Sequence, residues 1–187
     1  MSSFRYAMLT LLAREPLSGY DIKQQMNSRM GPFWKAGSNQ VYPELAKMDD
    51  EGLVALYGVE QKDYRPARKV YQITENGRQE LIRWTIEPTK PEIIRDEFLL
   101  KAYNSWLVKP EEMIPQLREK KKEHEGKLTI YLEKINELNE ILDLSNPYDP
   151  ILSSISVVEF GIEYEKLYIT WCNNLIKRLQ DKINEPS

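Results

Sequence analysis

The sequence GSNQVYPELAKMDDEGLVALYGV, residues 37–59, decides the fold of the first half of the chain. It opens with a Gly-Ser pair, which is a helix-start signal, and its apolar residues then recur at helical spacing on one face. Gly52 stands where a helix C-cap belongs, and residues 53–59 have the apolar composition of a short strand. The stretch therefore predicts a helix over residues 37–50 that is followed at once by a strand.

Predicted strands and helices lie on both sides of this stretch. A second strand is predicted over residues 68–74, and the polar segment 60–67 has the composition of a hairpin tip. Ser18 and Asp21 form a capping box at a helix start. Three further helices are predicted, over residues 4–12, over residues 18–30 and from Thr74 onward. This order is that of a winged helix-turn-helix, whose recognition helix enters the major groove of DNA. We therefore expect a mainly α (α+β) protein that begins with a winged helix-turn-helix carrying a two-stranded wing.

A proline-containing joint divides the chain. Pro88 and Pro91 disfavour a helix, so we expect a DNA-binding domain over residues 1–87 and a helical domain over residues 92–187. Three helices are predicted in the second domain, over residues 95–107, about 110–142 and 151–183. The last two are too long to bury themselves in a small domain. We therefore expect an antiparallel helical dimerisation domain through which two copies of the chain associate.

The second of these helices carries an apolar seam. Its members follow the 3-4-3-4 spacing of a coiled coil. The residues expected at the interface of a homodimer are Leu128, Tyr131, Ile135, Leu138 and Leu142.

The net charge of −3 hides an uneven distribution along the chain. Residues 1–84 hold 12 Lys and Arg against 10 Asp and Glu, a net charge of +2. Residues 85–187 hold 14 against 19, a net charge of −5. Binding to phosphate depends on a local basic face rather than on the whole chain, so the overall acidity is compatible with a DNA partner.

The predicted recognition helix and wing hold polar side chains suited to DNA. Short and amide side chains at a helix start can reach base edges, and Gln or Asn can bond adenine bidentately. Cations on a wing can contact backbone phosphates. The expected DNA-contacting residues are Ser38, Asn39, Gln40, Tyr42 and Lys47 on the helix and Lys62, Arg65, Arg68 and Lys69 on the wing. Taken alone, the wing charges could equally be solvated loop charges.

An ordered series of segments resembles the PadR family of bacterial transcriptional regulators. The segments are SGYDI at residues 18–22, FWKAGSNQVYPEL at 33–45, EGLV at 51–54, RPARKVYQITENG at 65–77 and RDEFLLK at 95–101. The resemblance implies a homodimeric repressor whose DNA contacts map onto the same helix start and wing. Dimer symmetry then predicts double-stranded operator DNA with an inverted repeat, its half-sites about 10 bp apart. The long C-terminal part is similar to the subgroup that responds to phenolic acids.

A set of aromatic residues in and beside the second domain could line a pocket for a planar aromatic effector. The alternative, that each one packs the dimer core, is the commoner role for any single residue. The candidates are Phe98, Tyr103, Trp106, Phe160, Tyr164 and Trp171.

Signals for catalysis, metal binding and membranes are missing from the sequence. One Cys and one His exclude an internal disulfide and leave few soft metal ligands. We find no phosphate-binding Gly loop and no HExxH, CxxC or Gly-x-Ser-x-Gly motif. The apolar stretches are too short to cross a bilayer, and no signal peptide is visible. We expect a cytoplasmic protein that is not an enzyme and has no metal or cofactor.

Two single residues have structural interpretations. His124 lies in the charged run KKKEHEGK, residues 120–127, and is expected to be solvated. Cys172 follows Trp171 on a long helix and is expected to be a small packed thiol.

The rival hypothesis is a winged-helix module that binds a protein partner and never binds DNA. Such a module does not require Arg65, Arg68 and Lys69 together beside a polar recognition-helix start. Their grouping favours a DNA-binding regulator.

Overall fold

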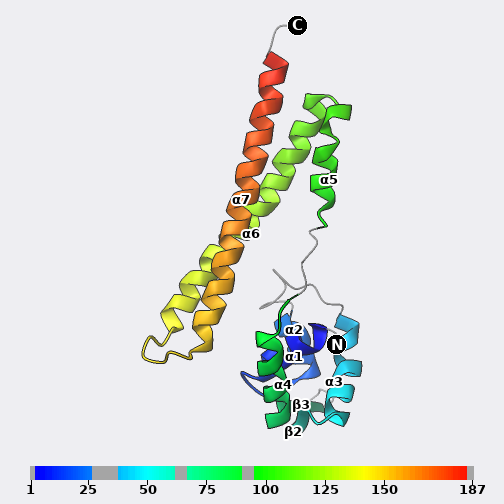
Figure 1. Ribbon diagram of the computed structural model, residues 1–187, viewed down its shortest axis with the longest axis vertical. Helices are drawn as coiled ribbons and strands as arrows, with labels where there is room; N and C mark the ends of the chain where they lie inside the picture. The colour runs from blue at the N-terminus through cyan, green and yellow to red at the C-terminus, as the bar shows by residue number, and fades with distance from the viewer. Residues whose placement is uncertain (1–2, 27–37, 62–66, 90–94, 185–187) are drawn as a thin grey trace. The chain divides into compact units, whose positions relative to one another are not determined.

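The computed structural model describes residues 3–26, 38–61, 67–89 and 95–184. They belong to two compact units, Met1–Glu92 and Ile93–Ser187, each with its own cluster of buried apolar side chains. In Figure 1 the elements of the first unit run from blue through cyan to the green of α4 (Glu75–Ile86), and the helices of the second unit run from green through yellow to red.

The first unit contains four α-helices, three strands and one 3-10 turn among its described residues. In chain order they are α1 (Ser3–Leu12), β1 (Leu17–Ser18), α2 (Gly19–Gln25), η2 (Ser38–Gln40), α3 (Val41–Asp50), β2 (Val54–Glu60), β3 (Arg68–Ile73) and α4 (Glu75–Ile86). Helices α1, α2 and α3 meet in the core, where Met8, Ile22 and Met48 are fully buried. The predicted order of helices and wing strands is confirmed.

The sheet has three strands in the order β1-β3-β2, all antiparallel. The wing strands pair from Val54 opposite Ile73 to Glu60 opposite Arg68, with a bulge before Gly58. The short strand β1 was not predicted, because two residues are too few to show a strand period.

Local capping signals hold the ends of the helices as the sequence predicts. The Ser18–Asp21 capping box opens α2. The Thr74 hydroxyl accepts a hydrogen bond from the Gly77 amide, which caps α4, and donates to the carbonyl of Gly52. Gly52 follows α3 with a φ of 70°, a left-handed conformation that favours glycine.

The start of the recognition helix differs from the prediction. The α-helical geometry begins at Val41, and a 3-10 turn over Ser38–Gln40 precedes it, whereas one helix was predicted over residues 37–50. Pro43 explains the tight first turn, because it has no amide hydrogen to donate to the carbonyl of Asn39.

The second unit is a helical hairpin with a short helix before it. It comprises α5 (Glu97–Tyr103), η3 (Ser105–Leu107), α6 (Pro110–Ile141) and α7 (Pro150–Asn184), and α6 and α7 lie side by side (Figure 1). The two long predicted helices are confirmed. The single helix predicted over residues 95–107 is wrong, because it breaks at Asn104, whose side chain donates to the carbonyl of Leu100. Among the described residues, no helix has the length and apolar content that crossing a membrane requires.

Candidate nucleic-acid interface

The outer face of α3 presents the predicted base-contacting residues. Val41, Leu45 and Met48 are buried against the core, so the opposite face of the helix points to solvent. That face and the 3-10 turn before it carry exposed side chains at Asn39, Gln40, Tyr42 and Lys47, and the turn begins at Ser38. The amphipathic pattern of α3 therefore brings together the residues expected to contact DNA.

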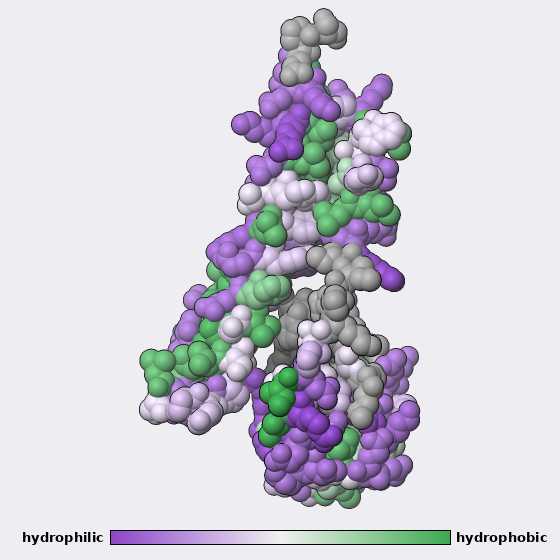
Figure 2. Space-filling model, in the orientation of Figure 1, coloured by the Kyte–Doolittle hydropathy of each residue, from purple (hydrophilic) through white to green (hydrophobic). Residues whose placement is uncertain are grey.

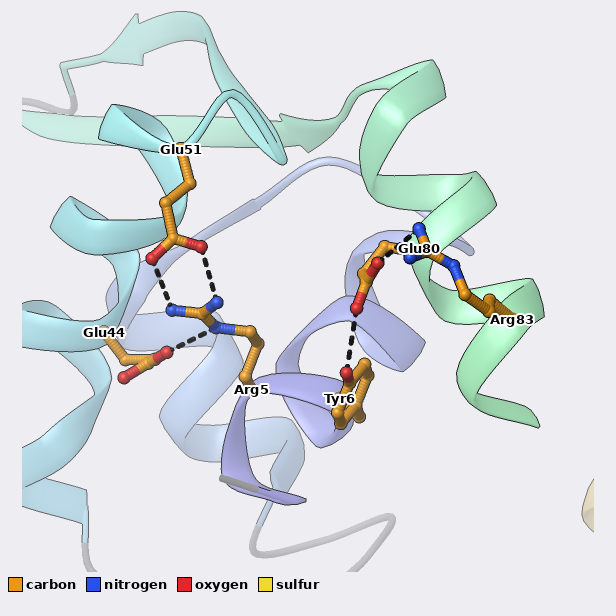
Figure 3. Close-up of polar contacts among 6 residues, drawn as sticks. All are labelled: Arg5, Tyr6, Glu44, Glu51, Glu80 and Arg83. Atoms are coloured by element: carbon orange, nitrogen blue, oxygen red, sulfur yellow. Dashed lines mark hydrogen bonds and ion pairs between the residues drawn. The ribbon is translucent and has the colours of Figure 1, made fainter. Parts of the chain in front are cut away.

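An arginine on α1 binds α3 and its C-cap through hydrogen bonds. Figure 3 shows Arg5 between two carboxylates of this helix and its C-cap. Its Nε donates to Glu44 Oε1 at 2.7 Å, and its two terminal nitrogens donate to Glu51 at 2.5 and 2.9 Å. The hydrogen bonds to Glu51 raise the pKa of Arg5, so this side chain stays charged. The contacts of this arginine were not predicted from the sequence, because its partners lie 39 and 46 residues away.

A second set of contacts fastens α1 to α4. The ring of Tyr6 stacks on Trp84, with centroids 4.5 Å apart. The Tyr6 hydroxyl donates to Glu80 at 2.9 Å, and Arg83 pairs with the same carboxylate (Figure 3). Burial and the bond to Glu80 raise the pKa of Tyr6, so its hydroxyl remains a donor. Helix α1 is thus fixed on both sides, to the recognition helix and to the helix after the wing.

The described base of the wing carries two of the four predicted wing cations. Lys69 is exposed on β3, and Arg68 lies at the end of the paired region, opposite Glu60. The guanidinium carbon of Arg68 is 4.1 Å from the ring centroid of Tyr20 on α2. Lys62 and Arg65 lie outside the described residues.

The first turn of α2 also touches the recognition helix. A Cβ placed on Gly19 would lie 2.6 Å from Cε1 of Tyr42 and 3.3 Å from Leu45. Glycine is therefore required here for the Tyr42 ring to lie against the backbone of α2. Neither this glycine nor its neighbour Tyr20 was among the residues that the sequence predicted to contact DNA.

A buried polar cluster lies between α6 and α7 in the second unit, and it corrects one prediction. His124 was expected to be solvated, but only 3% of it is exposed. Its Nδ1 is in hydrogen-bond contact with Glu165, which is 4% exposed, and its ring stacks on Tyr168 at 3.7 Å. The Nε2 atom of His124 has no hydrogen-bond partner among the described residues. The burial of His124 against Glu165 was not predicted, because the two residues are 41 positions apart and the local sequence around His124 is charged.

The same cluster holds the N-terminus of α5. Asp96 accepts from the amides of Phe98 and Leu99, and its second oxygen accepts from the Tyr168 hydroxyl at 2.9 Å. Burial favours a higher pKa for Asp96, but these hydrogen bonds outweigh it and lower the pKa. Burial and the bond to Asp96 raise the pKa of Tyr168. The start of the second unit is thereby attached to α7.

The structure gathers only part of the predicted effector set. Phe98 and Trp171 are half-buried and meet edge to face at 6.2 Å, and Tyr164 lies 6.2 Å from Tyr168. Tyr164 is 41% exposed, and Tyr103, Trp106 and Phe160 are more exposed still, at 71% or above. Figure 2 shows hydrophobic patches, in green, among the hydrophilic residues of the helices of the second unit.

The predicted dimer seam makes contacts within one chain. The ring of Tyr131 lies against Gly161 of α7, where a Cβ would be 2.9 Å from it, and Leu138 is buried. Leu128, Ile135 and Leu142 are half-buried. Their contact with a second copy stays a prediction. Cys172 is fully buried, as expected for a packed thiol.

Both units match known protein families. The profile described as "Transcriptional regulator PadR-like family" matches residues 8–83, and that described as "Virulence activator alpha C-term" matches residues 94–180. The chain is 31% identical to the Negative transcriptional regulator PadR of Bacillus subtilis (strain 168), over 94% of this chain and 97% of that protein.

Solved structures agree over nearly the whole chain. Bacillus subtilis PadR in complex with operator DNA matches with a TM-score of 0.84 and 30% identity, covering 96% of this chain and 98% of that one. The same protein in complex with p-coumaric acid matches with a TM-score of 0.78 and 30% identity, covering 96% and 99%.

Proposed function

The chain belongs to the PadR-like family of transcriptional regulators, and on that premise we propose that it is a homodimeric repressor that binds operator DNA. It is a DNA-binding regulator rather than an enzyme. The observation that carries the proposal is the 31% identity to a negative regulator over 94% of the chain, which spans both units. The family favours this function over a winged-helix module that binds only proteins.

The DNA-binding role falls to residues 1–87. The exposed start of the recognition helix reads bases through Asn39, Gln40 and Tyr42, with Ser38 beside them. Cations on the helix and the wing contact phosphates: Lys47, Lys62, Arg65, Arg68 and Lys69. A twofold dimer would bind an inverted repeat with half-sites about 10 bp apart.

The dimerisation role falls to residues 92–187. Large apolar side chains remain exposed on one chain, including Phe160 and Leu167 of α7 and Leu100 of α5. Exposed apolar groups of this size mark an interaction surface. Together with the half-buried seam residues Leu128, Ile135 and Leu142, they form the surface through which two copies associate, whereas Tyr131 and Leu138 of the seam are already covered within one chain.

A small phenolic acid would release the repressor from DNA. The support is the p-coumaric acid complex of the Bacillus subtilis relative, together with the aromatic side chains of the second unit. An effector acts only if it binds the DNA-competent and the DNA-incompetent arrangements of the dimer with different affinity. The proposed binding to operator DNA supports a cytoplasmic location for the protein.

Fluorescence anisotropy tests the function. The full chain is titrated at two salt concentrations with a duplex from upstream of its own gene and with a random-sequence duplex. Tighter binding to the upstream duplex is expected, and p-coumarate should weaken it. Absence of binding to either duplex at low salt would support the protein-interaction module instead.

Three variants test the proposed contacts. Gln40→Ala should cost about 1–3 kcal/mol and relax the base preference at one position. Arg68→Ala should weaken binding to both duplexes and reduce the salt slope by about 1. Lys177 is an exposed cation on α7, so Lys177→Ala is the matched control and should change neither the affinity for DNA nor its salt dependence. If Gln40→Ala and Arg68→Ala both bind like the wild type, the assignment of these contacts is wrong.

A further inference from the structure

The first turn of α2 lies between the two elements proposed to contact DNA. On one side, the Gly19 backbone meets the ring of Tyr42 on the recognition helix. On the other side, β1 pairs Ser18 with Val70, so that α2 begins beside the segment of β3 that carries Arg68. The next residue, Tyr20, has its ring 4.1 Å from the Arg68 guanidinium. One turn of helix therefore sets the spacing between the recognition helix and the base of the wing.

This turn is held rigidly by its own hydrogen bonds. The Ser18 hydroxyl donates to Asp21 at 2.5 Å, the Ser18 amide donates to the same carboxylate at 3.1 Å, and the Asp21 amide donates back to the Ser18 hydroxyl at 3.2 Å. Because these bonds are internal to the turn, they fix the backbone from which the Tyr20 ring projects.

The Tyr20 ring is not explained by the core. It is 49% exposed, while its neighbours Gly19 and Ile22 are buried. The half of the side chain that the core leaves uncovered offers a face on which a guanidinium can stack. The contact to Arg68 accounts for its placement.

The strand explains why Arg68 meets that ring. Side chains alternate along β3, so Arg68 shares a face with Val70, which is buried, and Lys69 points the other way. Among the described residues, no carboxylate lies within ion-pairing distance of Arg68. An ion pair would orient a guanidinium and also neutralise it, whereas a ring orients it and leaves its charge available to a phosphate.

We propose that Tyr20 is a positioning residue for DNA binding, which holds the Arg68 guanidinium at the base of the wing, at a set distance from the recognition helix, ready to contact a backbone phosphate. The proposal rests on the DNA-binding function proposed above and adds a residue outside the expected contact set. The Tyr20 ring orients the Arg68 guanidinium, and the Tyr20 hydroxyl is not required.

A double-mutant cycle on the full chain tests this inference. Anisotropy is measured with the upstream duplex and with a random-sequence duplex for Tyr20→Phe, Tyr20→Leu, Arg68→Ala and Tyr20→Leu/Arg68→Ala. Tyr20→Phe keeps an aromatic face and should bind like the wild type. Tyr20→Leu should weaken binding to both duplexes by about two- to tenfold, the range expected for loss of one cation–π contact. In the Arg68→Ala background, Tyr20→Leu should have no further effect.

A purely structural role for Tyr20 would give a different result. Tyr20→Leu would then weaken binding equally with and without Arg68, and that outcome overturns the proposal, as does unchanged affinity of Tyr20→Leu. Thermal unfolding of each variant reports on the fold, and Tyr148→Leu, which removes an exposed tyrosine of the second unit, is the matched control. Failure of the proposed function is distinguishable, because the wild type itself would then show no binding to either duplex.

Discussion

Replacing Arg5 with Met should destabilise the first unit by about 2–3 kcal/mol, because the substitution keeps the apolar stem and removes three charged hydrogen bonds. The arginine side chain is 11% exposed and Glu44 is 15% exposed, so that carboxylate is left nearly buried without its partner. Glu51 is 47% exposed and can be rehydrated, so its two bonds contribute less. The upper part of the range requires that the Glu44 carboxylate stay nearly buried without a new hydrogen-bond donor.

The assay is urea unfolding followed by circular dichroism. Arg83→Met is the matched control, because Arg83 is 64% exposed and Glu80, although only 13% exposed, keeps the hydrogen bond from the Tyr6 hydroxyl; the expected change in stability is less than about 0.5 kcal/mol. In the double variant Arg5→Met/Glu44→Gln the loss of unfolding free energy should be smaller than the sum of the two single losses, since both substitutions remove the same contact. Equal stability of the Arg5 and Arg83 variants, with no coupling to Glu44, would refute this account of how α3 is anchored.

Three further outcomes follow from single sites. Gly77→Ala should lower the free energy of unfolding by about 3 kcal/mol, because its Cβ would lie 2.0 Å from the carbonyl oxygen of Leu53; calorimetry that finds no loss would contradict the contact. Gly126→Ala should instead stabilise the chain by about 0.5–1 kcal/mol, since a Cβ added there would meet no described atom within 4 Å apart from its own helix backbone and chain neighbours. The lowered pKa of Asp96 should contribute stability above the unfolded pKa, near 4, that is lost as the pH falls through the folded pKa. Tyr168→Phe should reduce this acid dependence in urea titrations at stepped pH, and an unchanged profile would speak against the bond.

Features made by neighbouring residues were predictable from the sequence. The Ser18–Asp21 box, the Thr74 cap and the turn at Gly52 each depend on bonds or backbone conformations within a few residues. Their signals lie in the sequence next to the helix ends that they cap, so the order of the helices, the starts of α2 and α4 and the end of α3 could be predicted directly. The end of α2 at Gln25 and the start of α3 at Val41 differ from the predicted bounds, residues 30 and 37.

Features made by distant residues were not predictable. Arg5 meets its partners across 39 and 46 residues, and His124 meets Glu165 across 41 residues. Neither the arginine nor the histidine differs in its local sequence from a solvated residue. Burial of such groups depends on which helix packs beside them, and one sequence does not contain that information.

The seam on α6 shows the same limit for an apolar pattern. The 3-4-3-4 spacing indicated a covered face, and the face is covered at Tyr131 and Leu138. The covering at Tyr131 comes from α7 of the same chain. Periodicity tells which residues need a neighbour, and it does not tell whether the neighbour belongs to the same molecule.

The burial of Cys172 makes the chain convenient for spectroscopy. It is the single cysteine of the sequence, it has no exposed surface, and burial raises its pKa, so it reacts poorly with thiol reagents. A cysteine introduced at an exposed position outside the proposed DNA contacts, such as Gln72 on β3, would therefore take a spin label selectively, without a prior cysteine-free background. In the proposed homodimer each labelled wing has one symmetry mate, so a single pulsed resonance experiment would report the distance between the two wings with and without DNA.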